Sequence, residues 1–313
     1  MANRSLGLAR KNKNDEFYTA YDDIQKELIH YARLFRGKVI YCNCDDHNGI
    51  GLGTPKSNFL KYLADNFQAF GIKKVIATHY EVGRRSAMYI LDKDNTGDGI
   101  ICAEDILEIP LMGDGDFRSA ECIELLKQAD IVITNPPFSL FREYVAQLME
   151  YKKKFLIIGN DNCRTYKEIF RLFKANQIWC GYNTVKKFVK PNGEIQKFGN
   201  VSWYTNLPTT HRNEYIDTGK RYYGFQVMYP KYDNYDAINV NKISDIPMDY
   251  DGVMGVPITF LNQHNPQQFD IVGLIAGNIK GMSGLVSKTG KDGPYINDKL
   301  LYGRILIRKK KEN

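Results

Sequence analysis

The sequence lacks the features that mark several common classes of protein. No apolar run approaches the ~20 residues that a membrane-spanning helix needs, and residues 1–10 are too polar for a secretory signal. Gly49, Gly51 and Gly53 do not complete the dinucleotide motif G-x-G-x-x-G, because Thr54 interrupts it. No G-x-x-x-x-G-K-[ST] phosphate loop occurs. We therefore expect a cytoplasmic protein with no membrane partner, and a nucleotide-dependent oxidoreductase is disfavoured.

The chain is also poor in patterns that bind metal ions. Its five histidines are scattered without an H-x-x-x-H pair, and its six cysteines show no C-x-x-C spacing. We predict no metal site. Several cysteines fall in apolar strand or helix patterns, which is typical of reduced core residues. The six are Cys42, Cys44, Cys102, Cys122, Cys163 and Cys180.

The composition is that of a soluble globular protein with a basic surface. Of 313 residues, 43% are hydrophobic and 25% charged, which allows one large α/β domain or one domain with an accessory region. The net charge is +7. Basic residues cluster near both ends of the chain and at residues 152–154 and 186–190, and 21 Tyr and 16 Phe are interleaved with them. This pattern suits a polyanionic partner, although terminal lysines can also serve only solubility.

The first half of the chain alternates strands with helices. Residues 38–42 and 74–78 are short apolar strands, and a helix between them begins near Pro55. This unit predicts the start of a doubly wound sheet. Residues 111–117 are expected to form a strand and loop, and residues 155–159 another buried strand. Later in the chain, Asn192 and Gly193 indicate a β-hairpin.

The most informative stretch is residues 129–141. Residues 131–134 form a β-branched run that Pro136 and Pro137 end, which predicts a buried parallel strand and a rigid turn at its carboxyl end. A helix is expected to follow, with Ser139 as its N-cap. The apolar face of this helix comprises Phe141, Tyr144, Val145 and Leu148.

The turn Asn135-Pro136-Pro137-Phe138 suits methyl transfer to an amino group conjugated with an aromatic ring. Such a nitrogen is a poor nucleophile because its lone pair is delocalised. The Asn135 side-chain oxygen and the Pro136 carbonyl would accept hydrogen bonds from its two N–H groups. The proline ring fixes φ, so that this carbonyl is oriented before the substrate arrives. Phe138 would offer a flat face to a base taken out of its stack. The alternative is a structural Pro-Pro turn without a catalytic role.

A methyl donor would be held across the first strands of the sheet. At the end of the first strand, Cys42 to Asp46 occupy the place of a cofactor loop. Glu81 follows the second strand, where an acid binds ribose hydroxyls. Asp116 and Phe117 suit an adenine ring. Each signal also has a structural interpretation, because Asp45 and Asp46 suit an Asx turn and Glu81 a solvated charge. The donor expected here is S-adenosylmethionine.

Together, residues 13–19, 41–46, 113–119, 130–141, 231–240 and 252–260 closely resemble the EcoRI-type adenine-specific DNA methyltransferases. The resemblance covers most of the chain. It implies a monomer that methylates adenine N6 in double-stranded DNA after flipping the base. It also implies a Rossmann-like S-adenosylmethionine-dependent sheet with helices on both faces, and target recognition toward the C-terminus.

The resemblance also assigns roles to single residues. Asn135, Pro136 and Phe138 would hold the target base, and Asp116 with Phe117 would meet the cofactor's adenine. Near the methionine end of the cofactor it places Phe17, Tyr18 and Thr19, and in the cofactor loop Cys42, Asn43, Cys44 and Asp45. The first loop departs from the wider amino-methyltransferase pattern, because it lacks F-x-G-x-G.

We therefore expect a basic arm over residues 1–14, a catalytic domain over 15–205 and a target-recognition region over 206–313, in the modification enzyme of a restriction system. Two alternatives stay open. Related Asn-Pro-Pro-aromatic sites occur in enzymes that methylate RNA bases or glutamine side chains. A non-catalytic DNA-binding protein with this fold is the other alternative.

Overall fold

The computed structural model describes residues 18–45, 57–80, 83, 85–189, 195–197, 199–277 and 279–311. The chain divides into two compact units, one formed by residues up to 161 together with 181–207, and the other by residues 162–180 together with those from 208 onward. Among the described residues, no helix is long and apolar enough to cross a membrane, and no cluster of His, Cys, Asp and Glu is arranged to hold a metal ion.

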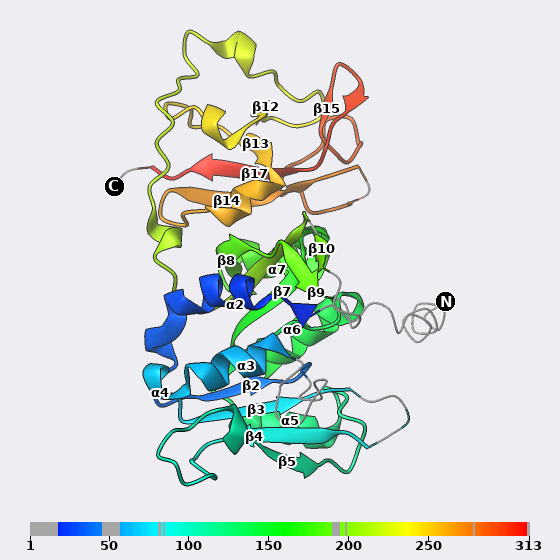
Figure 1. Ribbon diagram of the computed structural model, residues 1–313. Helices are drawn as coiled ribbons and strands as arrows, with labels where there is room; N and C mark the ends of the chain where they lie inside the picture. The colour runs from blue at the N-terminus through cyan, green and yellow to red at the C-terminus, as the bar shows by residue number, and fades with distance from the viewer. Residues whose placement is uncertain are drawn as a thin grey trace. The chain divides into compact units, whose positions relative to one another are not determined.

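The first unit is built on an eight-stranded mixed sheet (Figure 1). The strand order is β5-β4-β3-β2-β6-β7-β11-β8. The four central strands β3, β2, β6 and β7 are parallel, and antiparallel strands flank them. The strands are β2 (Val39–Cys42), β3 (Lys74–Thr78), β4 (Ala87–Leu91), β5 (Leu107–Pro110), β6 (Ile131–Thr134), β7 (Lys154–Asn160), β8 (Trp179–Thr184) and β11 (Val201–Thr205).

Alternate residues of the central strands pack against different helices. Ile40 and Cys42 belong to the core that α2 and α3 cover, whereas Tyr41 between them lies beside Cys122 of α5. Gly159 of β7 lies so close to the Phe141 ring of α6 that any Cβ there would overlap it. The helices are α2 (Tyr21–Leu28), α3 (Asn58–Asp65), α4 (Phe67–Phe70), α5 (Ala120–Gln128), α6 (Phe141–Glu150) and α7 (Lys167–Lys174).

Two acidic residues of α2 attach this helix to the far edge of the sheet. Glu27 is fully buried and accepts the backbone N–H groups of Tyr182 and Asn183, at 2.9 and 2.8 Å. Asp23 accepts those of Lys186 and Lys187. Each carboxylate therefore pairs backbone donors that no neighbouring strand satisfies.

The second unit carries its own four-stranded sheet in the order β12-β13-β17-β14. Its buried face includes Leu274, Ile305 and Ile307, and α7 packs on β14. A separate two-stranded hairpin precedes β17. The strands are β12 (Ile238–Asn239), β13 (Met254–Pro257), β14 (Phe269–Ile275), β15 (Tyr295–Ile296), β16 (Lys299–Leu300) and β17 (Arg304–Lys309).

The expected strand–loop–helix–strand unit is confirmed, since β2 and β3 are parallel and flank α3. The hairpin around residues 192–193 is confirmed by the antiparallel pair β9 (Lys187–Val189) and β10 (Ile195–Lys197), although its turn lies outside the described residues. Two local predictions are wrong. The strand expected at residues 111–117 is instead β5, which ends at Pro110. Ser139 does not cap α6, because a 3₁₀ turn (Phe138–Leu140) precedes that helix and its N-cap is Leu140.

Candidate active site

The carboxyl ends of three parallel strands are joined through Asp45. Its backbone N–H donates to the Thr78 carbonyl at the end of β3 (2.9 Å). Its carboxylate accepts the hydroxyls of Ser57, the N-cap of α3 (2.6 Å), and of Thr134, the last residue of β6 (2.8 Å). The carboxylate is buried, and the hydrogen bonds from these hydroxyls offset part of the free-energy cost of burying it. Asp45 therefore lies in the predicted cofactor loop, where it fixes the loop's shape.

Asn43 lies in the same loop and presents an unused hydrogen-bond donor. The Tyr144 hydroxyl of α6 donates to Asn43 Oδ1. Asn43 is only 2% exposed, and its Nδ2 has no acceptor among the described residues. Burial is the largest cause that raises the pKa of Tyr144 well above its ordinary value, so this hydroxyl stays a donor at neutral pH. A buried donor without an acceptor costs about 1–3 kcal/mol, so it suits a ligand that brings an acceptor.

The N-terminal motif reaches this region through α3. Thr19 is buried on β1 (Tyr18–Thr19), and its carbonyl accepts the side-chain amide of Asn58, the first residue of α3, at 2.7 Å. Its hydroxyl has no hydrogen-bond partner in the part of the chain that the structure describes. Tyr18 pairs with Val189 of β9. Phe17 and Glu81, which were also predicted to bind the cofactor, lie outside the described residues.

The loop of residues 113–117 lies close to the end of β3. Gly115 has a φ of +78°, and a Cβ there would overlap the carbonyl oxygen of His79, the residue after β3. Ser86 fixes the same place, because its hydroxyl donates to the His79 carbonyl (2.6 Å) and its N–H to the Gly113 carbonyl (3.0 Å). Glycine is therefore required at position 115 for both conformation and space.

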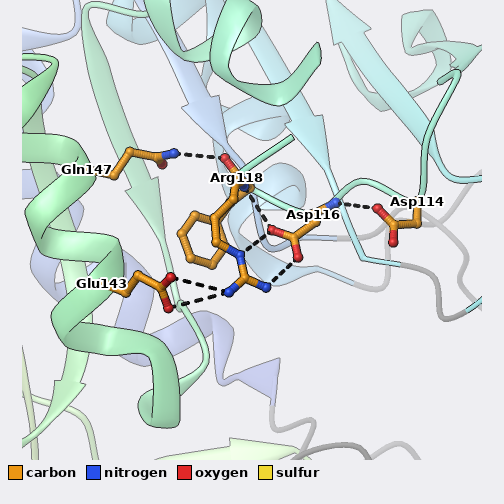
Figure 2. Close-up of polar contacts among 6 residues, drawn as sticks. Asp114, Asp116, Arg118, Glu143 and Gln147 are labelled. Atoms are coloured by element: carbon orange, nitrogen blue, oxygen red, sulfur yellow. Dashed lines mark hydrogen bonds and ion pairs between the residues drawn. The ribbon is translucent and has the colours of Figure 1, made fainter. Parts of the chain in front are cut away.

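Arg118 joins this loop to α6 (Figure 2). Its guanidinium binds both carboxylate oxygens of Asp116, at 2.9 and 2.6 Å, and contacts Glu143 of α6 at 3.3 Å. The hydrogen bonds from Arg118 are the largest cause that lowers the pKa of Asp116. Gln147 of α6 donates to the Phe117 carbonyl (3.0 Å). Asp116 is thus held ionised by Arg118, and an adenine amino group would have to share that carboxylate with it.

The Asn-Pro-Pro-Phe turn begins where β6 ends. Asn135 is half-buried, Pro136 is buried and Pro137 is exposed. Phe138 is partly buried and packs against the core formed with α2 and α3. The Leu140 N–H donates to the Pro137 carbonyl (3.0 Å), which starts the 3₁₀ turn before α6. The turn directly follows Thr134. The hydrogen bond that the Thr134 hydroxyl donates to Asp45 therefore also holds the start of the turn in place.

The two cysteines of the cofactor loop differ in their surroundings. Cys42 is buried in the core that α2 and α3 cover, and its side chain packs against the apolar residues there. Cys44 is half-buried. Burial is the largest cause that raises the pKa of both thiols well above the usual range, so both are neutral at physiological pH. Neither is activated as a nucleophile.

Several residues that shape the site were not predicted from the sequence. They are Ser57, Thr134, Tyr144, Arg118 and Gln147, and all act through partners in other segments, apart from the Arg118 pair with Asp116. The signal for Arg118 was its spacing of two residues from Asp116. Tyr144 was predicted only as a core residue of α6, and its ring does pack edge-on against Phe117, with centroids 5.1 Å apart.

Comparison with known proteins identifies the family. Residues 5–310 match the family model described as "Adenine-specific methyltransferase EcoRI". The chain is 45% identical to the type II methyltransferase M.EcoRI of Escherichia coli, covering 99% of this chain and 97% of that protein. It is 38% identical to the type II methyltransferase M.MpnI of Mycoplasma pneumoniae, covering 96% and 97%. The resemblance noted in the sequence is confirmed, and the chain belongs to the EcoRI family of adenine-specific methyltransferases.

Proposed function

We propose that this chain transfers a methyl group from S-adenosylmethionine to adenine N6 in double-stranded DNA, on a flipped base, as the monomeric modification enzyme of a restriction system. The observation that carries the proposal is the place of the Asn-Pro-Pro-Phe turn. It follows β6 at the carboxyl edge of the parallel strands, next to the loop that Asp45 joins to the same strand. Ligands of open α/β sheets bind at this edge.

The residues around the loop fit S-adenosylmethionine. Asn43 Nδ2 and the Thr19 hydroxyl are buried polar groups without a partner among the described residues, and the cofactor carries carboxylate, ribose and adenine acceptors. Gly115 lets the backbone approach β3 closely. We assign Asn43 and Thr19 to cofactor binding, with Asp116 and Phe117 toward the adenine. When bound, the cofactor supplies a methyl group carried on a sulfonium. We assign the eight-stranded sheet to the Rossmann-like methyltransferase type.

The protein's contribution to the reaction is made by fixed acceptors. The Asn135 side-chain oxygen and the Pro136 carbonyl accept hydrogen bonds from the two N–H groups of the adenine amino group. These hydrogen bonds draw the nitrogen toward a tetrahedral shape and free its lone pair. These dipoles are oriented before the base arrives, so they cost little reorganisation. Phe138 is only partly buried, and we assign its ring to stack on the flipped base.

The proposal is tested by expressing the chain in a host free of DNA methylation and sequencing its genome with single-molecule detection of modified adenines. We expect N6-methyladenine confined to one short sequence, and none with an Asn135→Ala variant. Incubation of the purified protein with labelled cofactor and DNA, RNA or protein fractions separates the alternatives. Label in RNA or protein, with none in DNA, contradicts the proposed substrate.

We also expect Tyr144→Phe to weaken cofactor binding. The variant keeps the ring that packs on Phe117 but removes the hydroxyl that orients the Asn43 amide. Loss of one buried hydrogen bond of about 1–2 kcal/mol corresponds to a Kd for S-adenosylmethionine raised roughly 5- to 30-fold. Isothermal titration calorimetry measures it. An unchanged cofactor Kd, or a KM that rises for DNA and not for the cofactor, would show that Tyr144 only packs.

A further inference from the structure

The connection between β14 and β17 is much longer than the fold requires. These strands are antiparallel neighbours, and Ile275 at the end of β14 is paired with Arg304 at the start of β17. A β-hairpin of this kind needs a loop of about two to five residues. Here residues 276–303 intervene. We call residues 279–303 the basic loop; such long connections in compact units are usually functional.

The basic loop is held in one shape by two adjacent residues. Asn234 is fully buried, and its Nδ2 donates to the carbonyls of Lys291 (2.9 Å) and Gly293 (2.8 Å). Its own carbonyl accepts the Lys288 N–H (2.8 Å). The Asp233 carboxylate accepts the N–H groups of residues 297 and 298 (3.2 and 2.8 Å). A segment attached at five points is preorganised for contact, so binding loses little conformational entropy.

The start of the loop is attached as firmly as its end. The Leu274 N–H of β14 donates to the Met282 carbonyl (2.8 Å). A Cβ at Gly273 would overlap the Ser283 carbonyl, and a Cβ at Gly284 would overlap that of Val272. Backbone therefore packs on backbone here. Beyond residue 284, Leu285 packs on the core of this unit, whereas the side chains of Val286, Lys288 and Lys291 are exposed.

Those side chains combine positive charge with apolar surface. Four lysines of the loop are exposed, against two aspartates, of which Asp298 is paired loosely with Lys291 at 3.6 Å. Val286 is 90% exposed and Tyr302 89% exposed. Exposed lysines beside exposed apolar groups suit a polyanion that also offers an apolar groove edge. The lysines are Lys280, Lys288, Lys291 and Lys299.

We propose that the basic loop is a DNA-binding element, in which Lys280, Lys288 and Lys291 contact phosphates of the duplex and Val286 packs into a groove. Lysine contacts to phosphate position a protein on the duplex without reading sequence, so this element supplies affinity and register. The identity of the polyanion rests on the proposed function, whereas the loop's charge, exposure and attachment do not.

The test compares the double variant Lys288→Ala/Lys291→Ala with a matched control, Lys73→Ala/Lys93→Ala, which removes two exposed lysines of the first unit. Binding to a labelled duplex is measured by fluorescence anisotropy at several salt concentrations. We expect the loop variant to bind about ten-fold or more weakly at 100 mM salt, and its salt slope to fall by about two, because each phosphate contact contributes about 0.9. The control should bind as the wild type does.

Hydrogen exchange of the full chain gives an independent readout. Adding the duplex should protect amides of residues 285–291 in the wild type. The proposal is overturned if the loop variant keeps the wild-type affinity and slope, or if the loop gains no protection from DNA. These outcomes differ from failure of the proposed function, in which the wild type itself leaves DNA unmethylated. Protection on raising the protein concentration alone would identify a second copy as the occupant and would also overturn the proposal.

Discussion

Replacing Asn135 with alanine should lower kcat for DNA methylation by about 10²- to 10³-fold, while the Kd for S-adenosylmethionine changes little. The size of this decrease in kcat follows from the loss of one preorganised hydrogen-bond acceptor at the reacting atom. Such an acceptor stabilises the transition state more than the ground state. Cofactor affinity is expected to survive because Asn135 follows β6, whereas Asn43 and Thr19 belong to other segments. Single-turnover methylation of a labelled duplex measures the chemical step, and calorimetry measures cofactor binding.

Ser139→Ala is the matched control for this variant. Ser139 directly follows the Asn-Pro-Pro-Phe turn, is exposed and does not cap α6, so replacing it with alanine should leave kcat within about two-fold of the wild-type value. If Asn135→Ala weakened cofactor binding as much as it slowed turnover, the residue would hold the loop rather than the reacting amino group. Equal kcat in the two variants would exclude the proposed role altogether.

Local patterns predicted the elements of this site well. Residues 131–134, predicted from their apolar run, form the fully buried strand β6. The helical spacing also predicted correctly the buried face of α6, which comprises Phe141, Tyr144, Val145 and Leu148. Both patterns depend on interactions between residues close in sequence or on burial of one whole element. The same reasoning failed at Ser139, where a tight turn after two prolines moves the N-cap one residue later, from Ser139 to Leu140.

Interactions between distant segments could not be predicted in this way. Thr134 and Asp45 are 89 positions apart, and Tyr144 and Asn43 are 101 apart, so no local spacing indicates either hydrogen bond. Asp45 was predicted to serve the cofactor, and the structure shows its carboxylate accepting two hydroxyls of the protein. Asp116 was treated as a free acceptor, although Arg118 occupies both of its oxygens. The pairing of the buried Asp45 carboxylate depends on the tertiary fold, whereas the Arg118 pair with Asp116 is local and could have been considered from its spacing of two residues.

Glu27→Ala should destabilise the first unit by about 2–5 kcal/mol. The carboxylate accepts four donors, namely the Tyr31 hydroxyl, the Tyr182 N–H and both the backbone and side-chain N–H groups of Asn183. Alanine leaves the two part-buried backbone donors without an acceptor, and each unsatisfied donor costs about 1–3 kcal/mol when water cannot reach it. Urea unfolding followed by fluorescence of the buried Trp203 of β11 measures the change. Glu124→Ala on α5 removes an exposed glutamate whose side chain pairs, among the described residues, only with Lys127. This variant should change stability by less than about 0.5 kcal/mol.

The same residue predicts how stability depends on pH. Burial is the largest cause that raises the pKa of Glu27, and it outweighs the four donors that lower it. Because the folded pKa lies above the unfolded value of about 4.3, the folded state favours the neutral carboxyl. This contribution is complete below pH of about 4.3 and is lost as pH rises through the folded pKa. The glutamine of Glu27→Gln cannot ionise. The free energy of unfolding of the wild type should therefore fall relative to that of this variant as pH rises from about 4 to 7. A difference that stays constant over that range would mean that the carboxylate is ionised throughout, with its donors rather than burial setting its charge.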